Sequence, residues 1–176
     1  MVSGFLSYVE IRTKITSVFA FMMALSYLFY IGQPIRALPT IVFFAAMFLF
    51  DLTTTAINNY IDSKTNDQVL PFKRRNALII IYILLILSTV LGLGLVVLTD
   101  IVVLLVGGLC FMCGIFYTYG PVPISRQPWG EVLSGIFYGL LIPFLLLHIN
   151  MPRGYFVSLN ISPEVVSGEV RLIPVL

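Results

Sequence analysis

The sequence predicts an all-α fold, a multi-spanning bundle of about five transmembrane helices. Hydrophobic residues make up 59% of the 176 residues and charged residues only 10%, whereas a water-soluble domain carries roughly a quarter charged residues. The mean hydropathy is +1.03. Five apolar runs, long enough to cross a bilayer with help from their flanks, alternate with segments rich in Pro, Gly and charge. The chain therefore belongs in a lipid bilayer, and a net charge of +2 gives no reason to expect nucleic acid as a partner.

Breaks in the apolar pattern place the five helices. The first follows an interfacial start and ends where Gly32, Gln33 and Pro34 interrupt the run. The second carries Pro39 in its first turn, where a missing amide hydrogen costs little. Asp100 marks a short turn between the third and fourth runs. The expected helices are residues 12–32, 37–58, 77–99, 101–117 and 131–149, all within an N-terminal unit of residues 1–153.

Small residues in the fourth run predict close helix packing. Gly107 and Gly108 would let a neighbouring backbone approach. Cys110 and Cys113 form a CFMC sequence, a spacing that also suits a redox or metal pair. Their flanks are wholly apolar and no second ligand pair accompanies them, so packing between helices is their expected role.

Basic residues are distributed unequally between the two sides of the predicted bundle. With the N-terminus in the cytoplasm, only Arg36 and Arg153 clearly fall outside, while Arg171 follows the fifth helix. The cytoplasmic side then holds Arg12, Lys14, Lys64, Lys73, Arg74, Arg75 and Arg126. This positive-inside bias predicts a protein integral to the cell (plasma) membrane, with the loops 59–76 and 118–130 both cytoplasmic.

The stretch 51–75 combines oxygen-bearing side chains with a basic cluster. If the end of its apolar run is helical, Asp51, Thr55, Asn58 and Asp62 lie on one face, and Asn66 extends it. Hard oxygen ligands beside a run of cations suit a divalent metal that holds a phosphorylated substrate. The alternative is a solvated interfacial loop with helix-capping Asn and Asp residues.

Two ionisable residues lie outside the loops. Asp51 is expected at membrane depth, where it either faces a polar cavity or pairs with another helix. His148 lies near the outer end of the fifth helix, where we expect a water-exposed interfacial side chain.

The end of the chain is mixed in character. Residues 154–176 are expected to form an external loop, with a helix start at Pro163 and the opening of an incomplete sixth helix at 171–176. This pattern leads us to expect a truncated protein.

Three motifs carry a resemblance to a known family. NNYIDSKTND, PFKRR and YTYGPVPISRQPWGEVLSGIFYG occur in this order at expected helix boundaries. Together with the opening VEIRTKITSVFAFMMALSYLFY, they resemble the first half of the UbiA superfamily of intramembrane prenyltransferases, over residues 5–150. Within it they look closest to the 1,4-dihydroxy-2-naphthoate prenyltransferases of menaquinone biosynthesis.

The resemblance implies an all-helical protein with nine spanning helices, of which about five are present. It also implies two aspartate-rich motifs that bind Mg²⁺ and the diphosphate of a polyprenyl donor. The first motif would place metal ligands at Asn58, Asp62, Asn66 and Asp67. Two of the three usual acids are therefore amides, which bring less charge to Mg²⁺.

The remaining site residues are also implied by the resemblance. Asp62, Lys73, Arg74, Tyr117 and Tyr119 would be catalytic, and Asn58, Asn59, Lys73, Arg74, Tyr119 and Glu131 would bind substrate. Alternatively, Glu131 is simply an acid at the start of a helix, where the helix dipole favours a negative charge.

The implied reaction is Mg²⁺-dependent transfer of a polyprenyl group to an aromatic acceptor, 1,4-dihydroxy-2-naphthoate above all. Metal and cations would neutralise the leaving diphosphate, and an aromatic pocket would shield the allylic cation from water. Phe116, Tyr117, Tyr119 and Tyr138 are candidates for that lining. Because a second aspartate motif is absent from the sequence, we expect little or no activity from this chain alone. Two alternatives stay open, a non-catalytic membrane protein on the same scaffold and an enzyme with another aromatic acceptor.

Overall fold

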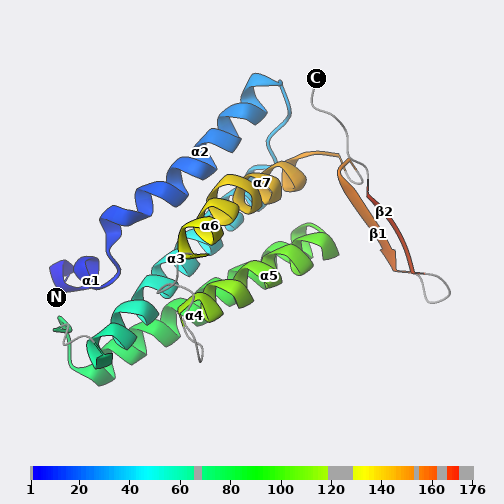
Figure 1. The fold of residues 1–176 in the computed structure, drawn as a ribbon. Coiled ribbons are helices and arrows are strands. Elements are labelled where there is room, and N and C mark those ends of the chain that lie inside the picture. Colours follow the sequence, from blue (N-terminus) through cyan, green and yellow to red (C-terminus); the bar gives the residue numbers. More distant parts are fainter. Residues whose placement is uncertain (1, 66–68, 119–128, 153–154, 162–165, 171–176) are drawn as a thin grey trace.

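The computed structural model shows a bundle of long helices packed side by side (Figure 1). It describes residues 2–65, 69–118, 129–152, 155–161 and 166–170. The short helix α1 (Val2–Tyr8) and the 3₁₀ turn η1 (Ile11–Lys14) lead into α2 (Ile15–Tyr30). The long helices that follow are α3 (Ala37–Thr65), α4 (Arg74–Leu98) and α5 (Ile101–Thr118). The last rod joins α6 (Trp129–Ile136), the π-helical turn η3 (Phe137–Leu141) and α7 (Ile142–Asn150).

Four helical stretches of the described chain are long and apolar enough to cross a membrane. They are Ile11–Tyr30, Ala37–Lys64, Arg74–Leu98 and Gly130–Asn150. The apolar part of α5, Ile101–Phe116, is shorter. A helical membrane bundle is thus the architecture, and the fifth expected crossing stays a prediction.

Local sequence explains where the helices end. Gly32 adopts a left-handed conformation with φ of 70°. Its amide donates to the carbonyl of Phe29, and the amide of Gln33 donates to the carbonyl of Leu28, which is the Schellman pattern that closes a helix. Asp100 caps the N-terminus of α5. Its Oδ1 accepts hydrogen bonds from the amides of Val102 and Val103 at 3.0 and 3.2 Å.

The helix that contains the polar stretch is longer than the sequence predicts. It was expected to end at residue 58, but α3 continues to Thr65. The last turns are therefore helical, although residues 59–65 were expected in a loop. Asn58 and Asp62 gain a fixed helical spacing from this extension.

Two clusters of buried apolar side chains hold the bundle. The larger includes Leu28 of α2 and Leu146 and Ile149 of α7, which are at most 1% exposed. The smaller joins α1, α3 and α4 around Tyr8 and Ala56. Many large apolar side chains instead point outward, such as Val97 at 86% exposure. Such an exterior suits lipid, which removes the need to bury these groups in protein.

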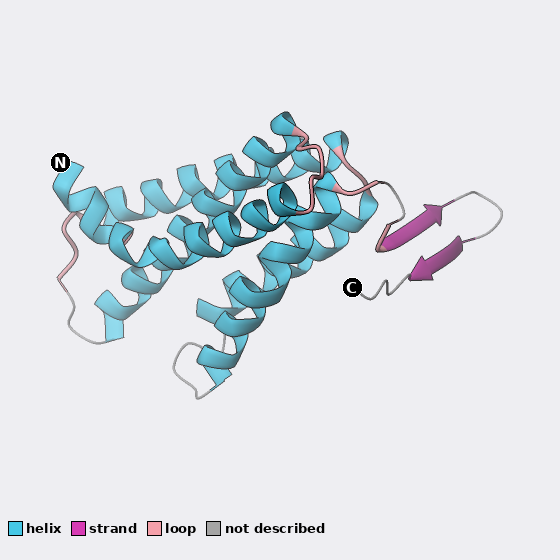
Figure 2. Cartoon of the chain, turned by 90° about the horizontal axis from the view of Figure 1, so that it is seen from above, coloured by secondary structure: helices cyan, strands magenta, loops and turns pink. Residues whose placement is uncertain are grey.

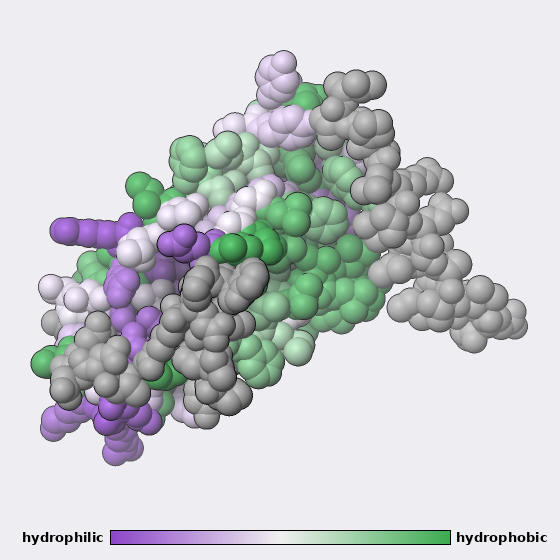
Figure 3. All heavy atoms as spheres, viewed as in Figure 1, coloured by the Kyte–Doolittle hydropathy of each residue, from purple (hydrophilic) through white to green (hydrophobic). Residues whose placement is uncertain are grey.

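Polar side chains gather at one end of the bundle. This end holds the N-terminus, the last turns of α3 and the start of α4, whereas hydrophobic side chains cover the middle of the face shown in Figure 3. The ends of α5 and α6 that flank residues 119–128 lie toward the same end (Figure 1). The described residues that flank both predicted loops therefore lie toward one end of the bundle.

A β-hairpin follows the helices. Strands β1 (Val157–Ile161) and β2 (Val166–Val170) pair antiparallel with Val157 opposite Val170, and the hairpin lies beyond one end of the bundle (Figure 2). The expectation of a helix from Pro163 is wrong over Val166–Val170, which form a strand. Pairing with β1 holds this segment extended, with Leu159 opposite Gly168 and Ile161 opposite Val166. Residues 171–176, expected to open a sixth helix, lie outside the described chain.

The close helix packing predicted at Gly107 and Gly108 of α5 is wrong. In the described chain, a Cβ added at Gly107 or Gly108 would meet nothing within 4 Å. Gly114 packs closely instead, since a Cβ there would lie 2.6 Å from the ring of Phe50. Gly107 and Gly108 line a partly open apolar cavity.

Candidate functional site

The last turns of α3 carry the predicted metal ligands. Asn58 and Asp62 lie one turn apart, and the Asn58 amide nitrogen donates to Asp62 Oδ2 at 3.2 Å. Both residues are half-buried. The other two expected ligands, Asn66 and Asp67, lie outside the described residues.

Asn59 points toward the start of the chain. Its amide nitrogen donates to the carbonyl of Tyr8 at 2.9 Å and to Glu10 Oε1 at 3.0 Å. These bonds support a left-handed turn at Glu10, whose φ is 47°. In this structure Asn59 thus ties α3 to the chain start, while its assignment to substrate binding stays a prediction.

Arg74 at the start of α4 contacts the last turns of α3. The Arg74 guanidinium donates to Ser63 Oγ at 3.3 Å and lies 5.4 Å from the ring centroid of Tyr60. Lys64 Nζ lies 4.9 Å from the same centroid. Tyr60 therefore contacts two cations through cation–π interactions in the last turns of α3. Lys73 precedes α4 and is exposed.

The second loop contributes less to the described site. Tyr117 lies in the last turn of α5, and Tyr119 lies outside the described residues. Glu131 is exposed in the first turn of α6, where an acid suits the helix dipole. Phe116 is 55% exposed, whereas Tyr138 lines the apolar cavity.

The residues at the end of α3 fit Mg²⁺ only in part. The described chain contains no group of three His, Cys, Asp or Glu residues that could hold a metal. Asp62 offers one carboxylate and Asn58 one amide oxygen. Since Mg²⁺ is often held by one or two carboxylates together with substrate phosphates, this pair suits an ion shared with a diphosphate.

A second polar cluster lies deeper in the bundle. Lys14 Nζ is 2.8 Å from Asp51 Oδ1, with side-chain exposures of 6% and 12%. Lys14 also donates to Thr55 Oγ1, and Ser17 Oγ lies 2.6 Å from Asp51 Oδ2. Of the two alternatives for Asp51, the pairing with another helical segment is confirmed, whereas the cavity that Asp51 borders is apolar and not the polar cavity expected. We predicted Lys14 to lie at the membrane interface with the other basic residues, and its contact with Asp51 was not predicted.

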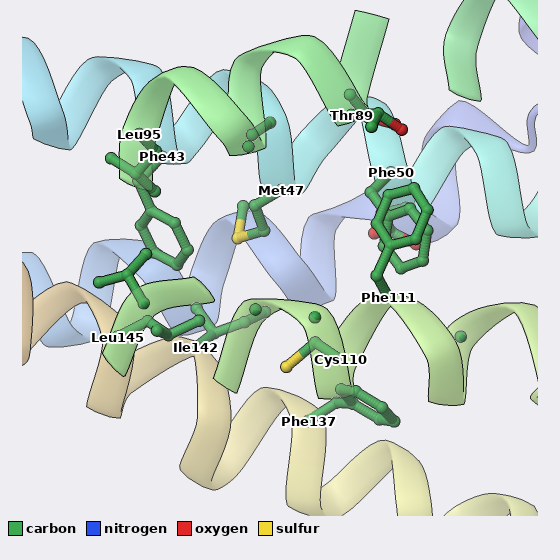
Figure 4. A pocket seen from close by; sticks show the side chains of 18 of the residues that line it. Phe43, Met47, Phe50, Thr89, Leu95, Cys110, Phe111, Phe137, Ile142 and Leu145 are labelled. Atoms are coloured by element: carbon green, nitrogen blue, oxygen red, sulfur yellow. The ribbon is translucent and has the colours of Figure 1, made fainter. Parts of the chain in front are cut away.

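The cavity lies among α2 to α5 and the last rod. Its volume is about 480 Å³, and Figure 4 shows aromatic and aliphatic side chains around it. The rings of Phe50 and Phe111 stack with centroids 4.3 Å apart. Cys110 also lines the cavity, and both cysteines are free thiols.

The opposite end of the bundle is closed by hydrogen bonds. His148 Nε2 lies 2.9 Å from Asp100 Oδ2, and the His148 side chain is only 4% exposed. The expectation of a water-exposed His148 is therefore wrong, because Asp100 and a stacked Phe144 enclose it. Arg36 donates to the carbonyls of Leu98 and Ile149, which ties three helix ends together.

Comparison of the sequence with protein-family models gives no match, and comparisons with curated proteins and with solved structures give none either. The resemblance to intramembrane prenyltransferases therefore stays a prediction from the three motifs.

Proposed function

We propose that this chain binds a polyprenyl diphosphate and serves Mg²⁺-dependent transfer of its polyprenyl group to an aromatic acceptor. The acceptor closest to the motif pattern is 1,4-dihydroxy-2-naphthoate, in menaquinone biosynthesis. One observation carries the proposal: Asn58 bonds to Asp62, and Arg74 donates to Ser63, the next residue after Asp62, at the polar end of helices that border an apolar cavity. In this proposal the polar end faces the cytoplasm of a cell whose plasma membrane holds the bundle.

The chemistry assigned to each part follows from its charge and burial. Arg74, held against Ser63 and Tyr60, would bind diphosphate oxygens through a planar fork of donors. Lys73, exposed beside it, would add a second positive charge. Asp62 and Asn58 would hold Mg²⁺, which when bound neutralises the leaving diphosphate. Rings such as Phe50 and Phe111 would keep water from an allylic cation.

A second candidate function is a non-catalytic scaffold that binds an isoprenoid. The observation in its favour is the small number of acids: Asp62 is the one carboxylate among the described members of the predicted metal set. The two candidates differ in what they recognise, because a scaffold needs the apolar tail and an enzyme needs the diphosphate.

Donor binding tests the proposal. The full chain in lipid nanodiscs is titrated with the unreactive analogue geranylgeranyl thiodiphosphate, with and without Mg²⁺. We expect Mg²⁺ to strengthen binding, and Asp62→Asn and Arg74→Gln each to weaken it about tenfold, as loss of a charge-assisted contact predicts. Arg75→Gln, an equal charge change at the neighbouring exposed residue, is the control and should stay within about threefold. Equal affinity for geranylgeraniol and the diphosphate analogue, with no effect of Mg²⁺, would favour the scaffold.

Sidedness supplies an independent test. Val69, 95% exposed between α3 and α4, is replaced by Cys in a chain with Cys110 and Cys113 changed to Ala. A membrane-impermeant thiol reagent should label Val69→Cys only after the cytoplasmic side is opened. Labelling of intact cells would contradict the proposed orientation. In a separate assay, turnover is measured with donor, Mg²⁺ and dihydroxynaphthoate. Robust turnover would contradict the expectation of little or no activity from this chain alone.

A further inference from the structure

Arg12 lies at the polar end of an apolar stripe on the outside of α2. The stripe consists of exposed residues at helical spacing, Ile15, Phe19 and Met22. Arg12 precedes the first of them by three positions and is exposed as well. A long basic side chain in this position can lay its apolar stem along the stripe and hold its charged end in the polar layer of a bilayer.

Arg75 has the same position on α4. It is exposed, and the exposed residues Ile79, Tyr82 and Ile86 continue its face of the helix. Each arginine is the second residue of a candidate membrane span, since these spans are Ile11–Tyr30 and Arg74–Leu98. At about 1.5 Å per residue, spans of this length reach or exceed the hydrocarbon core of roughly 30 Å. Both guanidinium groups therefore belong at the level of the lipid headgroups.

The protein itself does not use either guanidinium. In the part of the chain that the structure describes, Arg12 and Arg75 make no side-chain hydrogen bond, ion pair or ring contact. Two other arginines differ from them. Arg36 donates to the carbonyls of Leu98 and Ile149, and Arg74 has the partners described above. Arg12 and Arg75 are thus available to a partner outside the chain.

The surrounding charge favours an anion as that partner. Among the described residues of the polar end (Figure 3), five are basic, namely Arg12, Lys64, Lys73, Arg74 and Arg75, and three are acidic, namely Glu10, Asp62 and Glu131. Both α2 and α4 begin at this end, and the positive end of a helix dipole disfavours a nearby cation. The two arginines therefore do not stabilise their own helices, and a negative charge beside them would offset the repulsion.

The chemistry of the guanidinium narrows the choice of anion. Its planar fork of donors matches a phosphate group. A zwitterionic phospholipid carries a cation next to its phosphate, and that cation is repelled by the basic residues of the polar end. An anionic phospholipid lacks this cation, and its acyl chains contact the apolar stripe. A soluble phosphate has no group that could make the second contact.

We propose that Arg12 and Arg75 each bind the headgroup phosphate of an anionic phospholipid, whose acyl chains lie along the apolar stripe of the same helix. The two positions are separate lipid sites on the outside of the bundle. The inference does not rest on the proposed function, because neither arginine belongs to the predicted prenyl-transfer site.

Quenching by brominated lipids tests each position separately. In the full chain with Cys110 and Cys113 changed to Ala, a fluorophore is attached to Ile15→Cys or to Ile79→Cys. The protein is placed in phosphatidylcholine bilayers that contain increasing amounts of brominated phosphatidylglycerol or brominated phosphatidylcholine. We expect phosphatidylglycerol to occupy the position beside each fluorophore about fivefold more readily, as one cation near an anionic lipid predicts. Equal occupancy by the two lipids would overturn the proposal.

The two arginines serve as controls for each other. Arg12→Gln should abolish the preference for phosphatidylglycerol beside Ile15 and leave the preference beside Ile79 within about twofold. Arg75→Gln should do the reverse. Both variants remove the same charge from the polar end, so a general effect of net charge would lower both preferences in both variants. That outcome would contradict local headgroup sites.

A fluorophore at the other end of α4 supplies a second control. Val97 is exposed there, and the arginine at that end, Arg36, is already bound to carbonyls. Val97→Cys should therefore report similar occupancy by the two lipids. The same preference at Val97 as at Ile15 and Ile79 would show that unpaired arginines are not its cause.

Free phosphate distinguishes a lipid from a soluble ligand. Inorganic phosphate, added at constant ionic strength, should leave the preferences beside Ile15 and Ile79 unchanged, because a free anion does not contact the stripe. Loss of the preferences would identify a soluble phosphate as the ligand and overturn the proposal. Since Arg75→Gln is expected to leave donor binding nearly unchanged, failure of these lipid sites and failure of the proposed function give different results.

Discussion

Lys14 and Asp51 form a buried salt bridge between the turn that precedes α2 and the middle of α3, with 2.8 Å between Nζ and Oδ1. Thr55 and Ser17 complete the cluster. Because a lone charge inside a bilayer protein is costly, each member of the pair offsets part of the cost of burying the other. The pair therefore fixes how the start of the chain meets α3.

The first prediction concerns coupling within this pair. Lys14→Met or Asp51→Leu alone should each destabilise the protein by about 3–5 kcal/mol, since each leaves an uncompensated buried charge. The double variant should be much closer to wild type, because both desolvation costs vanish. Denaturant titration in detergent measures all four proteins. Additive losses would show that the two charges do not interact.

The same pair shows what the sequence could and could not predict. Apolar runs and their breaks were enough to place the long helices, because length and hydropathy depend on local composition. The partner of Asp51 was not predictable, since Lys14 lies 37 positions away and its burial depends on how two helices pack. Opposite charges at matching depth in neighbouring runs were the signal that could have found it.

Other differences have equally local causes. Residues 59–65 were predicted as a loop because their composition is polar, but they extend α3. Asn59 and Ser63 make hydrogen bonds with other parts of the chain, and a sequence pattern does not reveal such bonds. His148 lay near a predicted membrane boundary, but contact with Asp100 buries it. Of the predicted site, the structure joins Asn58 to Asp62 by a hydrogen bond, and it places Arg74 against Ser63, the residue that follows Asp62.

A second prediction concerns helix contact at Gly114. Gly114→Ala should push the Phe50 ring off its stack with Phe111, because the new methyl carbon would lie 2.6 Å from that ring. Overpacking of this kind costs about 1–3 kcal/mol. Gly94→Ala is the matched control, since a Cβ there would meet nothing within 4 Å in the described chain, and alanine suits a helix better by up to about 1 kcal/mol. Equal stabilities for the two variants would contradict close packing at Gly114.

A third prediction concerns the hydrogen bonds at the end of the bundle opposite the predicted metal ligands. Asn150 Oδ1 accepts from the Arg36 amide at 2.8 Å, and its nitrogen donates to Thr40 Oγ1 and the carbonyl of Leu146. Asn150→Leu leaves these buried groups without partners and should cost about 1–3 kcal/mol. The comparison is Asn76→Leu on the exposed start of α4, expected within about 0.5 kcal/mol of wild type. Thermal unfolding in nanodiscs measures both, and similar values would remove the structural role of Asn150.

The last prediction concerns stability in alkali. The Tyr8 hydroxyl is buried and donates to the carbonyl of Ala56 at 2.9 Å. Burial, with a smaller contribution from Tyr60, raises the pKa of Tyr8 above its ordinary value of 10.0. The folded protein therefore keeps this proton at a pH where the unfolded chain loses it. The stabilisation is complete below pH 10 and declines above it, by up to about 1.4 kcal/mol per pH unit.

Tyr8→Phe isolates this group from the other tyrosines. Below pH 10 the variant should be less stable by about 1 kcal/mol, the net contribution of one hydrogen bond. Above pH 10 the gap between wild type and variant should close and then reverse, because only wild type carries the raised pKa. The control is Tyr30→Phe, at an 87% exposed position. Its free energy of unfolding should differ from that of wild type by a constant amount at every pH. Denaturant titrations from pH 8 to about pH 11 measure the three proteins, and a constant gap for Tyr8→Phe would show that Tyr8 ionises normally in the fold.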